Sequence, residues 1–317
     1  MPRCWSLRGL RCAACSIGRR VGCRPARWLL GWRWLLALRW FPAWGGGRRT
    51  AGMSEVLDLQ PSAEESLDLL SLGRRVLQRR KGHRSATDDL IAAWVGAKAC
   101  PGARQVLDLG CGHGTVTLHL SEVLEDACFV GVEVNPISLD LARRNILLNG
   151  LKERVQLIGA DLRGLPSAQG WLHEGGFDLV TGTPPFMPLG SGALAQDPQR
   201  RAARFELNGG IEDYCLSAAR FVAAGGWVSM VMDGAQHGRV CSAFRQASLQ
   251  ICRVLAVVPR AGKAARYLAY LGQRAAMPQV GSSVAAIDGE LVVRNEQGQL
   301  TQQMRSLRSF LRLPRAT

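Results

Sequence analysis

The sequence predicts an α/β fold in which helices cover both faces of a mostly parallel sheet. The first observation is that strand-like apolar runs alternate with helix-like segments from Gln105 onward. The second is that a glycine-rich turn, 110–114, directly follows the first of these runs. Alternation of this kind is typical of parallel sheets with helical crossovers. A chain of 317 residues, 47% of them hydrophobic, also has ample material for one large core.

The expected elements follow one another without an internal repeat. Apolar runs predict strands at 105–109, 129–134, 155–158, 177–180, 227–232, 254–259 and 267–271. Helical segments are expected at 66–77, 90–97, 116–124, 136–148, 212–222, 239–248 and 302–312. An Asp-Gly pair inside 287–293 predicts a hairpin near the end of the chain. The expected division is a basic leader at 1–52, a helical lead-in at 53–100, the α/β domain at 101–278, and a C-terminal hairpin and basic helix at 279–317.

The first 50 residues differ in composition from the rest of the chain. They contain eleven arginines and no acidic residue, so they carry +11 of the net charge of +15 and leave about +4 for the remainder. They also hold four of the ten cysteines and six of the nine tryptophans. An arginine-rich segment without acids is typical of an organelle transit peptide, which predicts a location in the mitochondrion or plastid. The alternative is that translation starts at Met53, which predicts a location in the cytoplasm.

Neither a metal site nor a stable membrane insertion is expected. Cys12 and Cys15 have the spacing of a ligand pair, but no second pair lies nearby. The apolar run 28–44 is interrupted by Arg33 and Arg39 and is too short for a membrane span. The six cysteines that follow the leader are scattered singly, which is typical of small buried residues in a reducing compartment.

The stretch 106–114, which reads VLDLGCGHG, is the most specific in the chain. Three glycines at alternate positions follow a strand, and Asp108 stands two residues before the first of them. Glycines let the backbone turn tightly and let a ligand come close to the main chain. The fingerprint of a dinucleotide site needs a glycine where Thr115 stands. The turn therefore predicts a cofactor that lies flat over the main chain and carries no phosphate.

Two further acids stand at the ends of the next two strands. Glu133 ends the second strand, where a carboxylate can accept from both hydroxyls of a ribose. Asp161 ends the third strand and can accept from the amine of an adenine, with Leu162 as an apolar edge. Together with Asp108, these acids predict an adenosine pocket. Thr87 is expected to cap the helix that follows it, or to line the same pocket.

On these residues, 82–275 resembles the class I S-adenosylmethionine-dependent methyltransferases of the small-domain group. The resemblance implies an enzyme with a Rossmann-like, seven-stranded sheet whose last strand, near 267–271, is antiparallel. It makes 101–278 the catalytic domain and S-adenosyl-L-methionine the cofactor. It also implies that Glu133 meets the ribose and Asp161 the adenine. The residues implied around the methionine part of the cofactor are Asp108, Gly110, Gly112 and Gly114.

A rigid turn, Thr183-Pro184-Pro185-Phe186, follows the fourth strand. Proline donates no ladder hydrogen bond, so this turn exposes carbonyls, a hydroxyl and a flat ring at the end of a strand where α/β sheets bind ligands. In the group that the chain resembles, this place often reads Asn-Pro-Pro-Tyr or Asn-Pro-Pro-Phe. The resemblance implies that Thr183 and the Pro184 carbonyl accept the two N–H hydrogens of a planar amine while Phe186 stacks on it. Threonine keeps an acceptor oxygen there, on a shorter and stiffer side chain than asparagine.

Arginines follow this turn. Arg200, Arg201 and Arg204 are candidates for contacts with the phosphates of a nucleic acid, and a helix with solvated charges is the alternative. The basic triplet 79–81 is interpreted as a solvated helix end, and a contact with the phosphates of a nucleic acid is the alternative. The segments 198–204 and 289–294 resemble those of the bacterial tRNA(Val) adenine-N6 methyltransferases, within a resemblance that covers about 82–313. This resemblance implies adenine N6-methylation of RNA, and specifically of a tRNA.

Three other functions stay open at this point. The glutamine N5-methyltransferases of release factors share the Pro-Pro-aromatic turn, and 207–212 resembles their Gly-Gly-x-Asp segment. Arg204 and Phe205, however, stand where that family has Glu-Pro. A non-catalytic partner subunit would not need the glycine turn and both downstream acids. A small-molecule methyltransferase would not need the arginines. The sequence carries no information on the oligomeric state.

Overall fold

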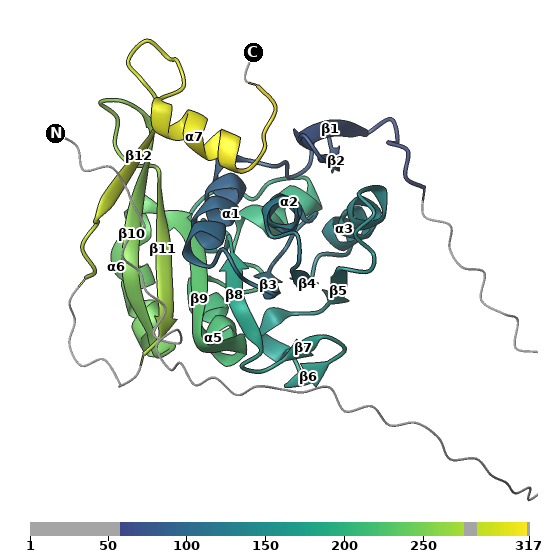
Figure 1. Cartoon of the computed structure of the whole chain (residues 1–317), viewed down its shortest axis with the longest axis horizontal. Coiled ribbons are helices and arrows are strands. Elements are labelled where there is room, and N and C mark those ends of the chain that lie inside the picture. Colours follow the sequence, from purple (N-terminus) through teal and green to yellow (C-terminus); the bar gives the residue numbers. More distant parts are fainter. Residues whose placement is uncertain (1–57, 276–283, 316–317) are drawn as a thin grey trace, which may run out of the picture. The chain divides into compact units, whose positions relative to one another are not determined.

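An eight-stranded sheet is the centre of the described part of the chain (Figure 1). The structure, a computed structural model, describes residues 58–275 and 284–315. The leader at 1–52, with Cys12 and Cys15, lies outside these residues, as does Met53, so the expectations about the leader and the location stay predictions. The strands lie in the order β12-β10-β11-β9-β8-β3-β4-β5.

The elements agree closely with the alternation in the sequence. The strands of the large sheet are β3 (Gln105–Leu109), β4 (Cys128–Glu133), β5 (Val155–Gly159), β8 (Phe177–Gly182), β9 (Val222–Asp233), β10 (Leu249–Arg260), β11 (Tyr267–Arg274) and β12 (Gly289–Arg294). The helices are α1 (Thr87–Ala99), α2 (Thr115–Val123), α3 (Pro136–Leu148), α4 (Pro198–Arg204), α5 (Ile211–Phe221), α6 (His237–Gln246) and α7 (Gln302–Phe310). Two-stranded sheets are formed by β1 (Glu65–Ser71) with β2 (Arg74–Arg79), and by β6 (Ala168–Gln169) with β7 (Leu172–His173).

Parallel pairing joins β5, β4, β3, β8 and β9, as the alternation predicts. β11 is antiparallel to both of its neighbours, β9 and β10, as the resemblance implies. β12 adds an eighth strand to the expected seven and pairs parallel with β10. After β3, the chain adds β4 and β5 on one side of this strand and later adds β8 and β9 on its other side. The strand order therefore reverses at β3. The carboxyl ends of these strands therefore border the crevice where such sheets bind ligands.

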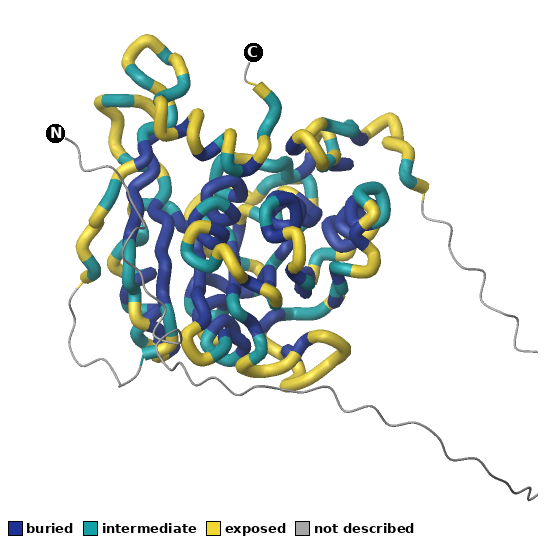
Figure 2. The backbone as a smooth tube through the Cα atoms, viewed as in Figure 1, coloured by how far each residue is buried: buried dark blue, intermediate teal, exposed yellow. Residues whose placement is uncertain are grey.

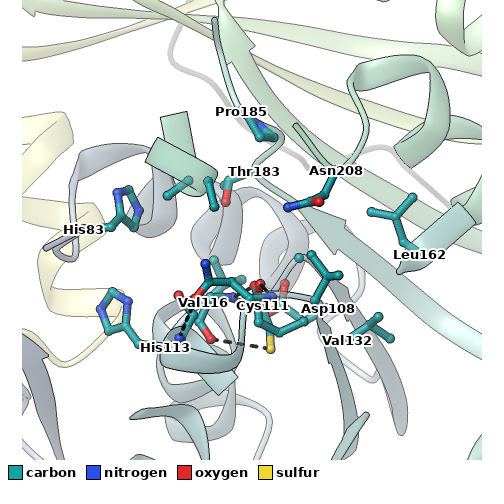
Figure 3. A pocket seen from close by; sticks show the side chains of 18 of the residues that line it. His83, Asp108, Cys111, His113, Val116, Val132, Leu162, Thr183, Pro185 and Asn208 are labelled. Atoms are coloured by element: carbon teal, nitrogen blue, oxygen red, sulfur yellow. Dashed lines mark hydrogen bonds between the residues drawn. The ribbon is translucent and has the colours of Figure 1, made fainter. Parts of the chain in front are cut away.

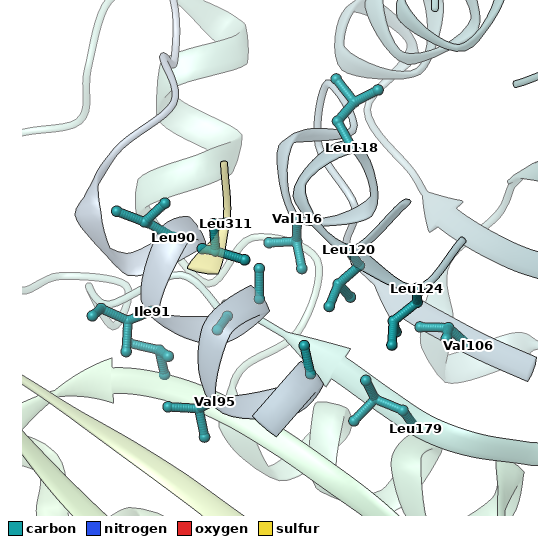
Figure 4. Packing of buried hydrophobic residues seen from close by; sticks show 14 of the residues in the cluster. Leu90, Ile91, Val95, Val106, Val116, Leu118, Leu120, Leu124, Leu179 and Leu311 are labelled. Atoms are coloured by element: carbon teal, nitrogen blue, oxygen red, sulfur yellow. The ribbon is translucent and has the colours of Figure 1, made fainter. Parts of the chain in front are cut away.

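Helices bury both faces of the sheet (Figure 2). Neighbouring residues of β8, Leu179 and Val180, belong to separate core clusters because successive side chains of a strand point to opposite faces. Ile91 of α1 and Val116 of α2 pack over the first face together with Leu179 (Figure 4). Phe221 of α5 belongs to the cluster on the second face. Among the described residues, no helix combines the length and the apolar composition that crossing a membrane would require.

The helix predicted at 66–77 is wrong, because this segment forms the β1–β2 hairpin. An isolated hairpin is barely stable, so its partners decide the conformation. Asn149 at the end of α3 accepts from the backbone N–H of Arg75 at 2.9 Å and donates to its carbonyl at 2.8 Å. Arg144 of α3 also pairs with Glu65 at 2.7 Å. The hairpin is thus held by side chains that lie about 70 residues away in the sequence, and local spacing could not reveal them.

The hairpin predicted at 287–293 is also wrong, because β12 is a single strand. The backbone N–H of Asp288 donates to the carbonyl of Val254 at 3.0 Å, and its carboxylate accepts from Arg253 Nε at 2.6 Å. Both bonds fix the Asp-Gly pair alongside β10, whose edge would otherwise stay open. The basic helix predicted at 302–312 is confirmed as α7.

Candidate active site

A cavity lies at the carboxyl ends of β3 and β4, below the turn that follows β8 (Figure 3). Gly110 and Gly112 line it and have φ values of 62° and 58°, which only glycine adopts readily. A β-carbon on Gly112 would meet no other atom within 4 Å, so the main chain here is open to the cavity. Gly114 does not line the cavity and instead stands at the start of α2, with φ of 92°. The predicted site residues that line the cavity are Asp108, Gly110, Gly112, Glu133, Leu162, Thr183 and Pro185.

Asp108 is buried beneath the glycine turn. Its two carboxylate oxygens accept from the hydroxyl of Thr117 on α2 at 2.8 Å and from that of Thr181 on β8 at 2.9 Å. Burial raises the pKa of Asp108 to about 6, although both hydroxyls act in the opposite direction. The carboxylate therefore joins a helix and a strand under the turn, and its position does not depend on a ligand.

Glu133, the last residue of β4, is also buried. Its carboxylate accepts from the backbone N–H of Gly112 at 2.8 Å and from that of Asn135 at 2.6 Å. Burial raises the pKa of Glu133, and these two amides lower it. Each carboxylate oxygen has more than one acceptor site, so the group can still accept from two hydroxyls of a ligand.

A second cavity, of about 600 Å³, shares Thr183 and His83 with the first. Pro184 and Phe186 line this second cavity, whereas Pro185 lines the first. The ring of Phe186 lies 5.4 Å from that of Tyr267, centroid to centroid. The turn after β8 thus forms part of both walls, and Thr183 stands where the two cavities meet.

Six cationic side chains line the second cavity, which we call the basic cleft. They come from the segment after β2, from α4 and from the turn before β11, and they are Arg80, Lys81, Arg84, Arg200, Arg204 and Arg266. Asp88 and Asp233 are the acids in its lining. Arg201 does not line the cleft, although it shares α4 with two of these arginines. The triplet 79–81 is not a helix end, because it ends β2 and brings two cations to the cleft.

Comparison with known proteins finds a matching family model and two similar curated proteins. A family model described as a methyltransferase domain matches residues 106–195. A tRNA1(Val) (adenine(37)-N6)-methyltransferase from Porphyromonas gingivalis is 29% identical over 150 residues, 47% of this chain and 58% of the relative. Its namesake from Aeromonas hydrophila is 30% identical over 188 residues, 58% of this chain and 74% of the relative. The chain belongs to the class I S-adenosylmethionine-dependent methyltransferases.

Two further similarities concern the fold and an alternative substrate. The methyltransferase shares its fold with a solved structure from Agrobacterium tumefaciens described as a predicted O-methyltransferase, with a TM-score of 0.54 and 19% identity over 73% of this chain and 99% of the other. A release factor glutamine methyltransferase from Chlorobaculum tepidum is 33% identical over 96 residues, 30% of this chain and 32% of the relative. The match spans 58% of the length of the Porphyromonas relative and 47% of that of a protein of the same name from Haemophilus influenzae, so this chain covers about half of each.

The cofactor of this methyltransferase is S-adenosylmethionine, and the first cavity fits it. The main chain at Gly112 is open, so the cofactor can lie flat over the turn. The Glu133 carboxylate has lone pairs left for the ribose hydroxyls, and Leu162 gives an apolar edge to the cavity. In the described residues, no group of three or more His, Cys, Asp or Glu side chains is arranged to hold a metal ion.

Besides Gly114, two residues that the sequence places at the cofactor lie elsewhere. Thr87 lines neither cavity, and it is not the N-cap of α1. The N-cap is Ala86, and its backbone N–H donates to the Asp89 carboxylate at 3.1 Å. Asp161 does not line the cavity, although its neighbour Leu162 does. Its carboxylate accepts from Arg163 Nε at 2.9 Å, so a role at the adenine requires that this pair open.

The cavities also contain residues that the sequence did not single out. Tyr214 of α5 lies against the glycine turn, and its hydroxyl occupies the place of a β-carbon on Gly110. Asn208, before α5, points into the first cavity from the side of Thr183 (Figure 3). The rings of His83 and His113 lie edge to face at 6.1 Å. For Tyr214 the sequence offered one signal, the helical spacing of α5. No such signal existed for His83, His113 and Asn208, because their positions depend on how loops fold back over the sheet.

Proposed function

We propose that this methyltransferase transfers a methyl group from S-adenosylmethionine to the exocyclic N6 of an adenine in a tRNA. The observation that carries the proposal is the position of Thr183, which lines both the cofactor cavity and the basic cleft. Several cations in one cleft match the spaced phosphates of a nucleic acid. The Phe186 and Tyr267 rings offer faces to an unstacked base, as proteins that bind single-stranded RNA do.

When bound, S-adenosylmethionine supplies an electrophilic methyl group. The lone pair of an adenine amine is delocalised into the ring, so the enzyme must raise the electron density on nitrogen. Thr183 and Pro184 both line the cleft at this place. The hydroxyl of Thr183 and the carbonyl of Pro184 are acceptors, and each can accept one N–H hydrogen of the amine. The backbone carbonyl of Phe186 is held by Gln236 Nε2 at 2.6 Å, which fixes the turn. The chain thus acts mainly by positioning the amine.

The charges of the cleft separate this proposal from its alternatives. The glutamine N5-methyltransferase alternative is supported by the Chlorobaculum relative, whose match covers 30% of this chain. The names of the Porphyromonas and Aeromonas relatives specify adenine 37 of tRNA1(Val), and those matches cover 47% and 58% of this chain. A release-factor glutamine needs no row of cations, whereas a tRNA does. A non-catalytic subunit would have no need for Thr183 at the meeting of two cavities.

The test in cells compares tRNA nucleosides with and without the gene by mass spectrometry, with organellar and cytosolic tRNA pools analysed separately. We expect N6-methyladenosine to fall in one pool. The pool affected also decides between the leader as an organelle transit peptide and a start at Met53. Unchanged N6-methyladenosine in both pools would exclude the adenine proposal.

The test with purified protein supplies labelled S-adenosylmethionine together with tRNA or with a release factor. Label in tRNA alone is the expected result. Label in the release factor alone would establish the glutamine alternative. Label in neither substrate, from protein that binds S-adenosylhomocysteine, would favour the partner-subunit alternative.

A further inference from the structure

Arg239, the third residue of α6, uses all five of its N–H donors on other side chains. Its Nε and Nη2 donate to the two carboxylate oxygens of Glu212 on α5, at 2.8 and 2.7 Å. Its Nη1 and Nη2 donate to those of Glu206, before α5, at 2.7 and 3.0 Å. The last donor, on Nη1, goes to Gln236 Oε1 at 2.8 Å. Because a guanidinium holds its donors in one rigid plane, these partners fix its orientation.

Through Gln236, this cluster reaches the turn 183–186, which we call the acceptor turn. A carboxamide has one accepting end and one donating end, and Arg239 occupies the accepting end. The donating end, Nε2, is thereby directed toward the carbonyl of Phe186, to which it donates at 2.6 Å. If the amide rotated by half a turn, two oxygens would face each other and no hydrogen bond would form. Arg239 thus selects the orientation of Gln236 that holds the acceptor turn.

Glu206 connects the same cluster to the residue that follows the acceptor turn. Its backbone N–H donates to the carbonyl of Met187 at 3.0 Å, while its side chain is bound by Arg239. The acceptor turn is therefore held at Phe186 through Gln236 and directly after it through Glu206. Both connections end on one guanidinium, so one side chain controls the position of the whole turn.

The cluster also lies against the segment that borders the cofactor cavity. Asn208 lines this cavity, and Gly210 follows two residues later. A β-carbon on Gly210 would lie 2.8 Å from Arg239 Nη2 and 2.9 Å from Glu206 Cδ, so the ion pair packs directly on this main chain. Neither Arg239 nor Gln236 lines the cofactor cavity or the basic cleft. Both residues therefore act on the reactants only through the walls that they hold.

We propose that Arg239 is a positioning residue for methyl transfer, which aligns the acceptor turn with the cofactor cavity through Gln236 and Glu206. This inference rests on the proposed function, because it requires the acceptor turn to hold the reacting amine. The nitrogen must attack in line with the carbon–sulfur bond, and a misplacement of about 1 Å can cost about a hundredfold in rate. Lysine at this position keeps the charge but lacks the planar fork that holds two carboxylates and an amide together.

The test measures single-turnover rates at saturating tRNA and S-adenosylmethionine for Arg239→Lys, for Gln236→Met and for the double variant. Each single variant is expected to lose rate about tenfold, while the Kd values for tRNA and S-adenosylhomocysteine change less than about twofold. The double variant should be as slow as Arg239→Lys alone, because Arg239 acts through Gln236. Arg220→Lys is the matched control and should keep the wild-type rate, since Arg220 of α5 also donates to a glutamate, Glu174, but lines neither cavity.

The outcomes separate the inference from the function on which it rests. Wild-type protein that methylates no tRNA overturns the proposed function and this inference with it. Active wild-type protein with an unchanged rate in Arg239→Lys overturns the inference alone, as does a variant that loses affinity but keeps its rate at saturation. Losses that multiply in the double variant exclude action through Gln236. The melting temperature reports folding, and if Arg239→Lys does not fold, a wild-type rate in Gln236→Met overturns the inference.

Discussion

The carboxamide of Asn145 in α3 is bonded to both main-chain groups of Leu77 in β2. Its Oδ1 accepts from the Leu77 N–H at 2.6 Å, and its Nδ2 donates to the Leu77 carbonyl at 3.0 Å. The same Nδ2 donates to the carbonyl of His113 in the glycine turn at 2.8 Å. One fully buried side chain thus joins the N-terminal hairpin to the cofactor turn. Because Arg80 and Lys81 follow this hairpin, the wall of the basic cleft depends on it.

Replacing Asn145 by alanine is expected to lower the free energy of unfolding by about 3 kcal/mol, because it leaves buried main-chain groups unpaired. The control is Asn149→Ala, which removes similar bonds to the more exposed Arg75 and is expected to cost about 1 kcal/mol. Urea unfolding of both variants measures the difference. Equal losses would contradict the larger contribution assigned to the buried bonds of Asn145.

Gly110 and Tyr214 form a tightly packed pair, because the tyrosine hydroxyl occupies the place of a β-carbon on the glycine. Gly110→Ala is expected to destabilise the fold by about 3 kcal/mol, from both the positive φ and the overlap. Gly112→Ala is the matched control, since its φ is similar at 58° but nothing lies within 4 Å of the added carbon. It is expected to cost about 1 kcal/mol in stability and to weaken S-adenosylhomocysteine binding.

Tyr214→Phe tests the cause of the larger loss. In a double-mutant cycle, Tyr214→Phe is expected to return part of the stability lost in Gly110→Ala, because the hydroxyl that overlaps the new carbon is gone. Additive losses in thermal or urea unfolding would contradict the overlap.

Asp108 predicts a pH dependence of stability. Burial raises its pKa from the usual 3.8 to about 6, so the folded state binds this proton more tightly than the unfolded state. Protonated Asp108 therefore adds to the stability of the folded state. This added stability is complete at a pH below the pKa of Asp108 in the unfolded chain, and it is lost as the pH rises through the pKa of Asp108 in the folded protein. Two pKa units correspond to about 3 kcal/mol. Without cofactor, Asp108→Asn is expected to show a flatter pH dependence of the melting temperature between about pH 4 and 6. Parallel curves for the two proteins would contradict this.

Thr183 is expected to act through its hydroxyl. Thr183→Ala should lower the single-turnover rate on tRNA at least about tenfold, since a lost hydrogen bond to the reacting amine costs more than 1 kcal/mol. Thr183→Ser keeps the hydroxyl and should retain most of the rate, and Thr183→Asn should retain part of it. An alanine variant as fast as the wild type would exclude Thr183 as an acceptor. Affinity for S-adenosylhomocysteine is measured alongside, because this residue also lines the cofactor cavity.

The two sides of α4 predict different effects on RNA. Arg204 lines the basic cleft and Arg201 does not. Arg204→Ala is expected to weaken tRNA binding and to reduce the slope of log affinity against log salt by about 0.7–0.9, one phosphate contact. Arg201→Ala removes the same charge from the same helix and is expected to change the slope less. Fluorescence anisotropy over a range of salt concentrations measures both, and equal slopes would contradict the assignment of the cleft.

The sequence alone determined seven of the eight strands of the large sheet and the glycine turn of the cofactor cavity. Apolar runs and helical spacing are local signals, so β3 and α3 appear at their predicted residues, 105–109 and 136–148. The glycine turn could also be predicted from the sequence. Its three backbone positions with positive φ require glycine, and glycines at alternate positions are visible in the sequence itself. Asp108 and Glu133 reach the cavity because the carboxyl ends of parallel strands share one edge.

Only the tertiary structure decided the hairpin and the basic cleft. The segment 66–77 has helical spacing, but bonds from α3 supply its main-chain partners, and they come from a distant part of the chain. The position of Arg80 in the cleft and the absence of Arg201 from it both follow from how these loops fold back. Sequence spacing carries no information about such contacts, because they depend on which surfaces the packed core brings together.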